Sequence, residues 1–211
     1  MGVKVHVLRE GTRFDGREGK IKVSRMCCSA VVLVVAGGRN IVVDPGAMGY
    51  AGEVVGALRR LDIGPEDVGV VVNTHMHLDH TFNNYLFPNA VIYTPTSVWH
   101  YGGGNRVEIY QHVVDPGIPG VRILDTPGHV EKHVSVAVET DEGCVVVAGD
   151  AVRECVILDG RVPPRYHDPV KYLESMRKVF DEADIIIPGH GPVIGGDRLR
   201  RLKKMLGGMR F

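Results

Sequence analysis

Residues 73–80 read Asn-Thr-His-Met-His-Leu-Asp-His and place three imidazoles and one carboxylate within six residues. They come directly after a nearly continuous apolar run, which is typical of a strand buried on both faces. In a loop leaving that strand, His75, His77 and Asp79 project to one side, and His80 begins the next turn. Burial of so many polar groups is unfavourable unless each finds a partner. Because neutral imidazole and carboxylate are common ligands of zinc, iron and manganese, the cluster predicts metal binding.

Three later segments share one form, in which a strand-like apolar run ends in a residue that can bind a metal. These residues are His129, Asp150 and His190, each directly preceded by a glycine that lets the backbone turn sharply. Together with the first motif they supply enough ligands for two metals. The expected grouping is His75, His77 and His129 on one metal, Asp79, His80 and His190 on the second, and Asp150 bridging both. Two metals about 3.5–4 Å apart can hold and deprotonate one water between them.

The ordered set resembles the metallo-β-lactamase-fold superfamily, whose members carry H-x-H-x-D-H, a separate histidine, a bridging aspartate and a final histidine. The seven residues match these positions one by one, and the likeness spans residues 41–192. It is closest in layout to compact stand-alone members, the metallo-β-lactamase domain-containing proteins, and it is also similar to glyoxalase II-like hydrolases. The resemblance implies an α/β fold, the αββα four-layer sandwich, in which two mixed sheets are flanked by helices and the metals lie at the sheet edge.

The resemblance also implies a cofactor of two divalent metal ions, with zinc favoured over iron or manganese. In such a hydrolase a metal-bridging hydroxide attacks an ester-type centre, namely a phosphodiester, a thioester or a lactone. Asp79 is the expected catalytic residue, because it would bind one metal and accept a hydrogen bond from the hydroxide.

A second activity in the same fold stays open at this point. Proteins that resemble persulfide dioxygenases keep a similar first motif but hold a single iron, through positions equivalent to His75, His129 and Asp150. The flavodiiron type is disfavoured, because its members carry Glu where this chain has His77. The alternative to a dinuclear hydrolase is therefore a mono-iron, persulfide dioxygenase-like oxidoreductase.

The elements that must position these residues follow from the apolar patterns. We expect strands at residues 3–8, 20–23, 30–36, 41–44, 68–73, 91–93, 121–124, 134–138, 144–148 and 185–187, and helices at residues 51–61, 169–183 and 197–206. Strands first, and then strands alternating with helices, indicate two sheets with helices outside rather than one doubly wound parallel sheet.

Several other residues receive weaker assignments. Thr74, Thr126 and Asp44 are expected either to orient the ligating imidazoles or to cap their own strand ends. His133 is expected to form a local hydrogen bond where a strand begins. The Gly102–Gly104 loop is either a lid over the site or a flexible connection. Surface or wall positions are the default for the remaining candidates, which are His100, His112, His167 and the basic residues of the last helix.

The four cysteines form no C-x-x-C pair, and each lies in or beside an apolar run. We therefore expect buried thiols rather than metal ligands or disulfides at Cys27, Cys28, Cys144 and Cys155. Gln111 is the only glutamine, which is consistent with the depletion of thermolabile residues in a thermophile.

Composition limits the partners. The 211 residues predict a single domain over residues 1–211, and 25 basic residues balance 25 acidic ones, so no overall field attracts nucleic acid. The expected partner is a small-molecule or phosphodiester substrate, and a nucleic acid is not indicated by the net charge. No apolar run approaches the roughly 18 residues of a membrane span, and no secretory pattern opens the chain, so we expect a cytoplasmic protein without a membrane partner. The oligomeric state is left open, and a homodimer is compatible with the sequence.

Overall fold

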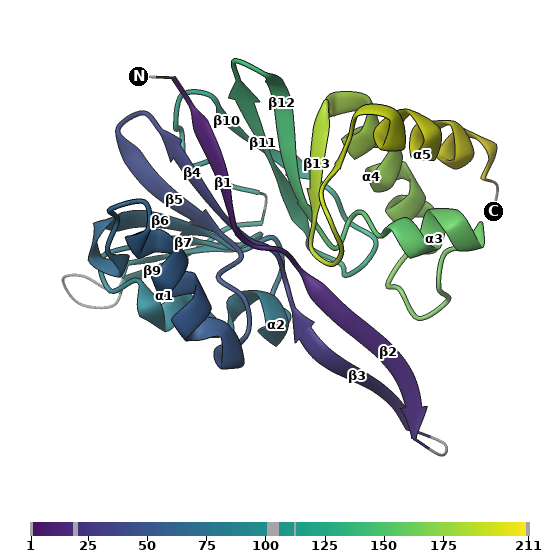
Figure 1. Cartoon of the computed structure of the whole chain (residues 1–211), viewed down its shortest axis with the longest axis horizontal. Helices are drawn as coiled ribbons and strands as arrows, with labels where there is room; N and C mark the ends of the chain where they lie inside the picture. Colours follow the sequence, from purple (N-terminus) through teal and green to yellow (C-terminus); the bar gives the residue numbers. More distant parts are fainter. Residues whose placement is uncertain (1, 19–20, 101–105, 112, 210–211) are drawn as a thin grey trace.

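The computed structural model describes residues 2–18, 21–100, 106–111 and 113–209. The first half of the chain forms a mixed sheet of seven strands (Figure 1). In spatial order they are β1 (Lys4–Arg9), β4 (Val31–Ala36), β5 (Arg39–Val43), β6 (Val68–Val72), β7 (Val91–Tyr93), β8 (Ser97–His100) and β9 (Arg106–Ile109). Strands β5, β6 and β7 are parallel to one another, and the other neighbours are antiparallel.

The second half forms a smaller mixed sheet of five strands. In spatial order they are β10 (Val121–Asp125), β11 (Val134–Thr140), β12 (Gly143–Gly149), β13 (Ile185–Pro188) and β14 (Ile194–Gly195). Only β12 and β13 pair in parallel, with Val145 opposite Ile185 and Val147 opposite Ile187. The parallel strands of both sheets therefore end at one edge of the molecule.

The two sheets pack face to face through alternate residues of their strands. Val32, Val34 and Ile41 of the first sheet join Val136 and Val147 of the second in one buried apolar cluster. Each fully buried aliphatic side chain contributes about 1.5–3 kcal/mol to this packing. The order of layers is helix, sheet, sheet, helix, which confirms the αββα sandwich that the sequence predicts.

Helices cover the outer face of each sheet (Figure 1). Helix α1 (Ala51–Arg59) packs Val54 and Leu58 onto the first sheet. The second sheet is covered by α3 (Glu154–Asp159), α4 (Pro169–Glu182) and α5 (Gly196–Gly208). Four shorter helical segments are η1 (Met48–Tyr50), η2 (Pro65–Asp67), α2 (Leu78–Thr81) and η3 (Phe82–Leu86).

Helix α4 has a strong start signal and supports the site from behind. The Asp168 side chain accepts hydrogen bonds from the backbone of Val170 and Lys171, and Pro169 occupies the first turn, where it lacks only an unneeded donor. Gly128 lies against this helix at φ +126°, and a Cβ atom there would come within 2.2 Å of the Tyr172 backbone nitrogen. Only glycine allows this contact, so the turn before His129 is fixed by the helix.

The structure adds elements that the sequence patterns did not indicate. Strands β2 (Thr12–Glu18) and β3 (Ile21–Cys28) form a two-stranded arm that extends away from both sheets (Figure 1). Residues 21–23 of the strand expected at residues 20–23 are thus the start of the longer β3, and residue 20 lies outside the described residues. Strand β2 reads Thr-Arg-Phe-Asp-Gly-Arg-Glu and lacks apolar alternation because it does not lie on a core. Short or polar elements were likewise missed, namely β8, β9, β14 and α3.

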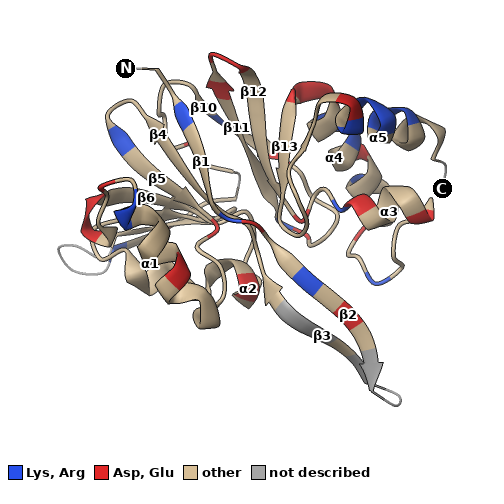
Figure 2. Cartoon of the chain, in the orientation of Figure 1, with Lys and Arg blue, Asp and Glu red and all other residues tan. Residues whose placement is uncertain are grey.

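The other expected strands and helices are confirmed to within a few residues of their ends. The Gly102–Gly104 loop and His112 lie outside the described residues. In the last helix, Leu202 and Leu206 are buried while Arg200, Arg201 and Lys204 are exposed on the outer layer (Figure 2). The basic run is therefore a solvated face. No helix in the described part of the chain has both the length and the apolar character to cross a bilayer.

Candidate metal centre

The seven expected ligands all follow strand ends at one edge of the two sheets. The first motif leaves β6, His129 follows β10, Asp150 follows β12 and His190 follows β13. Because the carboxyl ends of parallel strands meet at one edge, residues far apart in the chain converge there. The structure brings all seven side chains together.

Three imidazoles form the first group. His75 Nε2 lies 2.8 Å from His77 Nδ1, and His129 Nε2 lies 3.3 Å from the same nitrogen. Burial lowers the pKa of His75 and His77, and it lowers that of His129 to about 4. The three rings are therefore neutral near pH 7, which is the form that binds a metal.

The second group combines two imidazoles with two carboxylates. His190 Nε2 lies 3.3 Å from Asp79 Oδ2 and 3.4 Å from Asp150 Oδ1, and His80 Nε2 lies 3.6 Å from Asp150 Oδ1. The other oxygen of Asp150, Oδ2, lies 3.2 Å from His129 Nε2 in the first group. Asp150 thus presents one oxygen to each group.

Several buried polar atoms at this site form no hydrogen bond within the described residues. His80 Nε2, His190 Nε2 and Asp150 Oδ1 are inaccessible to solvent and form no hydrogen bond. Such atoms cost free energy when they are left unpaired. Divalent cations would satisfy them, and the donor set of imidazole and carboxylate suits zinc, iron or manganese. The residues present therefore fit a metal centre.

Asp44 orients His80 from behind. Its Oδ2 accepts a hydrogen bond of 2.8 Å from His80 Nδ1 and one of 2.7 Å from the Thr74 hydroxyl, while its Oδ1 accepts from the Thr74 backbone N–H at 2.8 Å. Burial lowers the pKa of His80, but the carboxylates of Asp44 and Asp150 outweigh it and raise the pKa to about 10. Nδ1 therefore keeps its proton, and Nε2 gives up its own when a metal binds.

Thr74 and Thr126 differ in their relation to the expected ligands. Thr74 Oγ1 lies 3.1 Å from His75 Nδ1, so Thr74 and Asp44 both orient rings of expected ligands. Thr126 Oγ1 instead lies 2.9 Å from His133 Nδ1 and 2.9 Å from Ser135 Oγ. The alternative role of Thr126 as an orienting partner of a ligand is therefore not borne out by its hydrogen bonds.

His133 is fully buried and forms the local hydrogen bonds expected at a strand start. The backbone N–H of Asp150 donates to His133 Nε2 at 3.2 Å, which leaves the proton on Nδ1 to donate to Thr126 Oγ1. Ser135 Oγ donates to the Ala148 carbonyl at 3.1 Å and completes the chain. This series of hydrogen bonds holds the backbone of Asp150 in place. Burial lowers the pKa of His133 to about 3.

The depressed pKa of His133 predicts a specific acid sensitivity. Below its unfolded pKa of about 6.5, the unfolded chain binds a proton that the folded one refuses until about pH 3, so stability is lost as pH falls through this window. One proton corresponds to about 1.4 kcal/mol per pH unit. We expect the unfolding free energy of metal-free protein, measured in urea between pH 7 and 4, to depend less on pH in His133→Gln. The difference in slope should correspond to about one proton. His167→Gln, at an exposed position, should keep the wild-type slope. Identical slopes for both variants would contradict the assignment.

The cysteines differ in part from the expectation. Cys28 and Cys144 are buried, whereas Cys155 is exposed and Cys27 is half-buried beside the expected ligand Asp79; none is in a disulfide. Cys27 Sγ lies 2.8 Å from Asp79 Oδ2, and burial together with that carboxylate raises the pKa of the thiol to about 12. In the metal-free site the thiol therefore donates to Asp79. Sequence reasoning missed it because β3 was expected to end before it.

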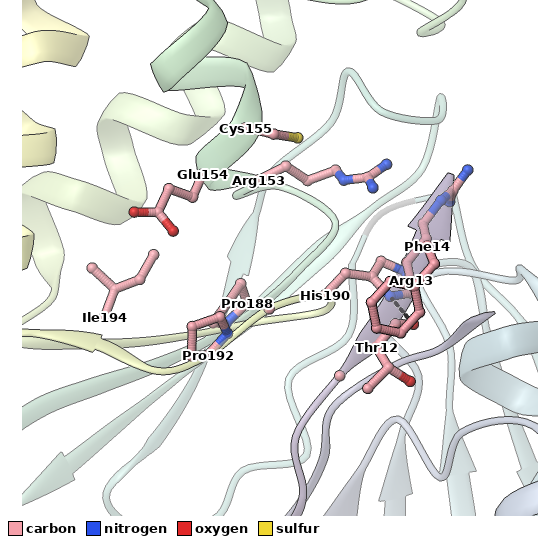
Figure 3. A pocket seen from close by; sticks show the side chains of 12 residues that line it. Thr12, Arg13, Phe14, Arg153, Glu154, Cys155, Pro188, His190, Pro192 and Ile194 are labelled. Carbon is pink, nitrogen blue, oxygen red and sulfur yellow. Dashed lines mark hydrogen bonds between the residues drawn. The ribbon is translucent and has the colours of Figure 1, made fainter. Parts of the chain in front are cut away.

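Two cavities open beside the cluster. One of about 460 Å³ reaches His77 and His129, and another of about 330 Å³ reaches His190 (Figure 3). Arg13 and Arg153 line both. His167 lines the larger cavity, which is one of the two positions expected for it. His100 Nε2 instead pairs with Glu108 at 3.2 Å.

A family model described as the metallo-beta-lactamase superfamily matches residues 27–190. The chain belongs to this superfamily. The chain is accordingly an enzyme, a metal-dependent hydrolase, in agreement with its curated relatives.

Two relatives match most of this chain. The metallo-beta-lactamase domain-containing protein 1 of Xenopus laevis is 32% identical over 191 residues, which are 89% of this chain and 79% of the relative. A protein of Methanocaldococcus jannaschii named as a probable metallo-hydrolase is 31% identical over 160 residues, 75% of this chain and 74% of the relative. The N-acyl homoserine lactonase of Bacillus thuringiensis is 28% identical over 65% of this chain and 61% of its own length.

Solved structures agree on the fold. A crystal structure from Thermotoga maritima, provisionally assigned as a metallo-beta-lactamase, has a TM-score of 0.67 at 22% identity and covers 93% of this chain and 100% of its own. An N-acyl homoserine lactone hydrolase, solved with its product at the catalytic metal centre, has a TM-score of 0.61 at 23% identity and covers 90% and 92%. At these identities the likeness concerns the fold alone.

Proposed function

We propose that this superfamily member is a dinuclear hydrolase of ester-type bonds in a phosphodiester, a thioester or a lactone. One metal is held by His75, His77 and His129, the second by Asp79, His80 and His190, and Asp150 bridges the two. The observation that carries the proposal is the division of the two Asp150 oxygens between the two groups, with three buried ligand atoms unpartnered. The similarity to a lactonase supports an ester-type substrate.

The chain's own residues prepare the reaction. Two divalent ions, with zinc as our choice, would lower the pKa of a water and polarise the attacked oxygen. Asp79 is the most exposed member of the second group, with its side chain 21% accessible, whereas Asp150 is 1% accessible. Asp79 is therefore placed to accept a hydrogen bond from the attacking water and aim it, which makes it the proposed catalytic residue. His129 and Tyr166 both line the larger cavity, with ring centroids 4.8 Å apart.

The proposal is tested by a metal count followed by a substrate panel. Protein reconstituted with zinc and dialysed should retain two ions per chain by elemental analysis and hydrolyse at least one of a lactone, a thioester and a phosphodiester. Two ions with no turnover of any of them would contradict the hydrolase assignment. A single iron with oxygen consumption on a persulfide would support the dioxygenase alternative instead.

The same proposal covers the domain organisation of the protein, its location and its partners. We propose one domain over residues 1–211 that acts in the cytoplasm on a small-molecule or phosphodiester substrate without a membrane partner. Light scattering of the zinc-loaded protein would decide between a monomer and a homodimer.

A further inference from the structure

An arginine stands beside the metal ligands without a carboxylate of its own. Arg153 follows Asp150 by three residues, lies just before α3 and is only 7% exposed. Within the described residues it forms no ion pair, and its side chain extends toward the strand that carries Arg13 and Phe14 (Figure 3). A buried guanidinium is costly unless an anion accompanies it. Asp150 supplies the strongest negative charge acting on Arg153, and in the proposed centre it would bind both metals.

Two more arginines line the same space. Arg13, on β2, lines both cavities with Arg153, and Arg165 lines the larger one. Burial and the positive charge of Arg153 both lower the pKa of Arg13, and its 2.8 Å bond to Asp15 more than offsets them. Arg13 and Arg153 are thus close enough to repel each other. An anion between them would turn this repulsion into attraction.

Carboxylates balance only part of the positive charge around these cavities. Asp15 pairs with Arg13, and Glu154, which lines the smaller cavity, pairs with Arg198 rather than with Arg153. Glu131 is exposed at the rim of the larger cavity. Arg165 is exposed, forms no ion pair in the described part of the chain, and has its guanidinium 5.7 Å from the Tyr166 ring centroid.

We propose that Arg153 and Arg13, with Arg165 at the rim, form a binding site for an oxyanion, and that the substrate carries a carboxylate or phosphate group beyond its scissile ester-type bond. The proposal rests on the dinuclear hydrolase proposed above for the position of that bond. A guanidinium fork binds a carboxylate or phosphate through paired hydrogen bonds, which gives orientation as well as affinity. The arginines would therefore place the scissile bond over the metals.

A matched pair of esters tests the site. Mono(4-nitrophenyl) glutarate and 4-nitrophenyl valerate differ only in a terminal carboxylate in place of a methyl group. The zinc-loaded wild type should favour the glutarate ester, and Arg153→Met should reduce the ratio of the two kcat/KM values by about 10- to 100-fold, mainly through KM for the glutarate ester. Arg201→Met, on the exposed face of α5, is the matched control and should keep the ratio. Arg13→Met, on the arm outside the core, repeats the test if Arg153→Met fails to fold.

A binding measurement separates this proposal from the hydrolase proposal. Glutarate and glycerol 3-phosphate are titrated by calorimetry into wild type and Arg153→Met of equal zinc content. The proposal predicts at least about tenfold weaker binding of one of them to the variant, and the more affected ligand identifies the anion class. If neither ester is hydrolysed, nor the lactone, thioester and phosphodiester of the substrate panel, but this loss is seen, the anion site stands and the hydrolase proposal fails. Equal binding by both proteins, or an unchanged ester ratio with intact hydrolysis, overturns the anion site.

Discussion

Asp150→Ala is expected to abolish both retention of the metal pair and hydrolysis. The two carboxylate oxygens face different ligand groups, with Oδ1 3.4 Å from His190 Nε2 and Oδ2 3.2 Å from His129 Nε2. Their removal leaves a buried site that is rich in imidazole without the carboxylate that both groups share. Loss of partners that only orient metal ligands costs about 10–100-fold, so loss of the bridging ligand should reduce kcat/KM by more than about 100-fold.

The measurement pairs elemental analysis with turnover on whichever substrate the wild type hydrolyses. Asp125→Ala is the control, because Asp125 is an exposed aspartate at the end of β10 whose side chain is not among the ligands. Circular dichroism and the melting temperature show whether each variant is folded. A folded Asp150→Ala protein that keeps two metals and wild-type turnover would exclude Asp150 as the bridge.

The cluster of candidate ligands could be predicted from the sequence, because these residue types are unfavourable in a strand-end loop without a metal. Apolar runs located the strands, and the two sheets followed from the order of strands and helices along the chain. The sequence also predicts the division of these ligands into two groups, but the distances between His190, Asp79 and Asp150 needed the structure, because they depend on strands far apart in the chain.

The surroundings of the site could not be predicted in the same way. Arg153 is one arginine after a Gly-Asp turn, and nothing near it in the sequence indicates that Arg13 lies across the same cavity. Strand β2 has no apolar alternation, so no pattern of period two in the sequence indicated the arm. Thr126 continues the pairing of β10 with β11 through its N–H bond to the His133 carbonyl, and this register turns its hydroxyl to His133 rather than to a ligand.

Asp44→Asn is expected to remove the second metal while leaving the fold in place. Asp44 is buried, adopts φ +49°, and its carboxylate accepts three hydrogen bonds from only two neighbours, Thr74 and His80. Asparagine tolerates this left-handed backbone and matches the shape of aspartate. The substitution therefore changes hydrogen-bond polarity at His80 with little change in packing.

The backbone N–H of Thr74 decides the orientation of the new amide. It can only donate, so the amide oxygen must take the position of Oδ1 and the NH₂ group that of Oδ2, 2.8 Å from His80 Nδ1. His80 Nδ1 must then accept, which moves the ring proton to Nε2. A protonated Nε2 cannot bind a metal, so zinc content should fall from two to one per chain, with a loss of about 1–3 kcal/mol in unfolding free energy.

The control makes the same substitution in the same backbone conformation. Asp62 is the other non-glycine residue of the described chain at positive φ, 57°, and is exposed. Asp62→Asn should keep both metals and full stability in parallel elemental analysis and urea unfolding. Two tightly held zinc ions in a folded Asp44→Asn protein would show that Asp44 does not set the proton position on His80. The size of the metal loss thus measures how far one carboxylate, which touches no metal in the proposed centre, controls a ligand through a single proton.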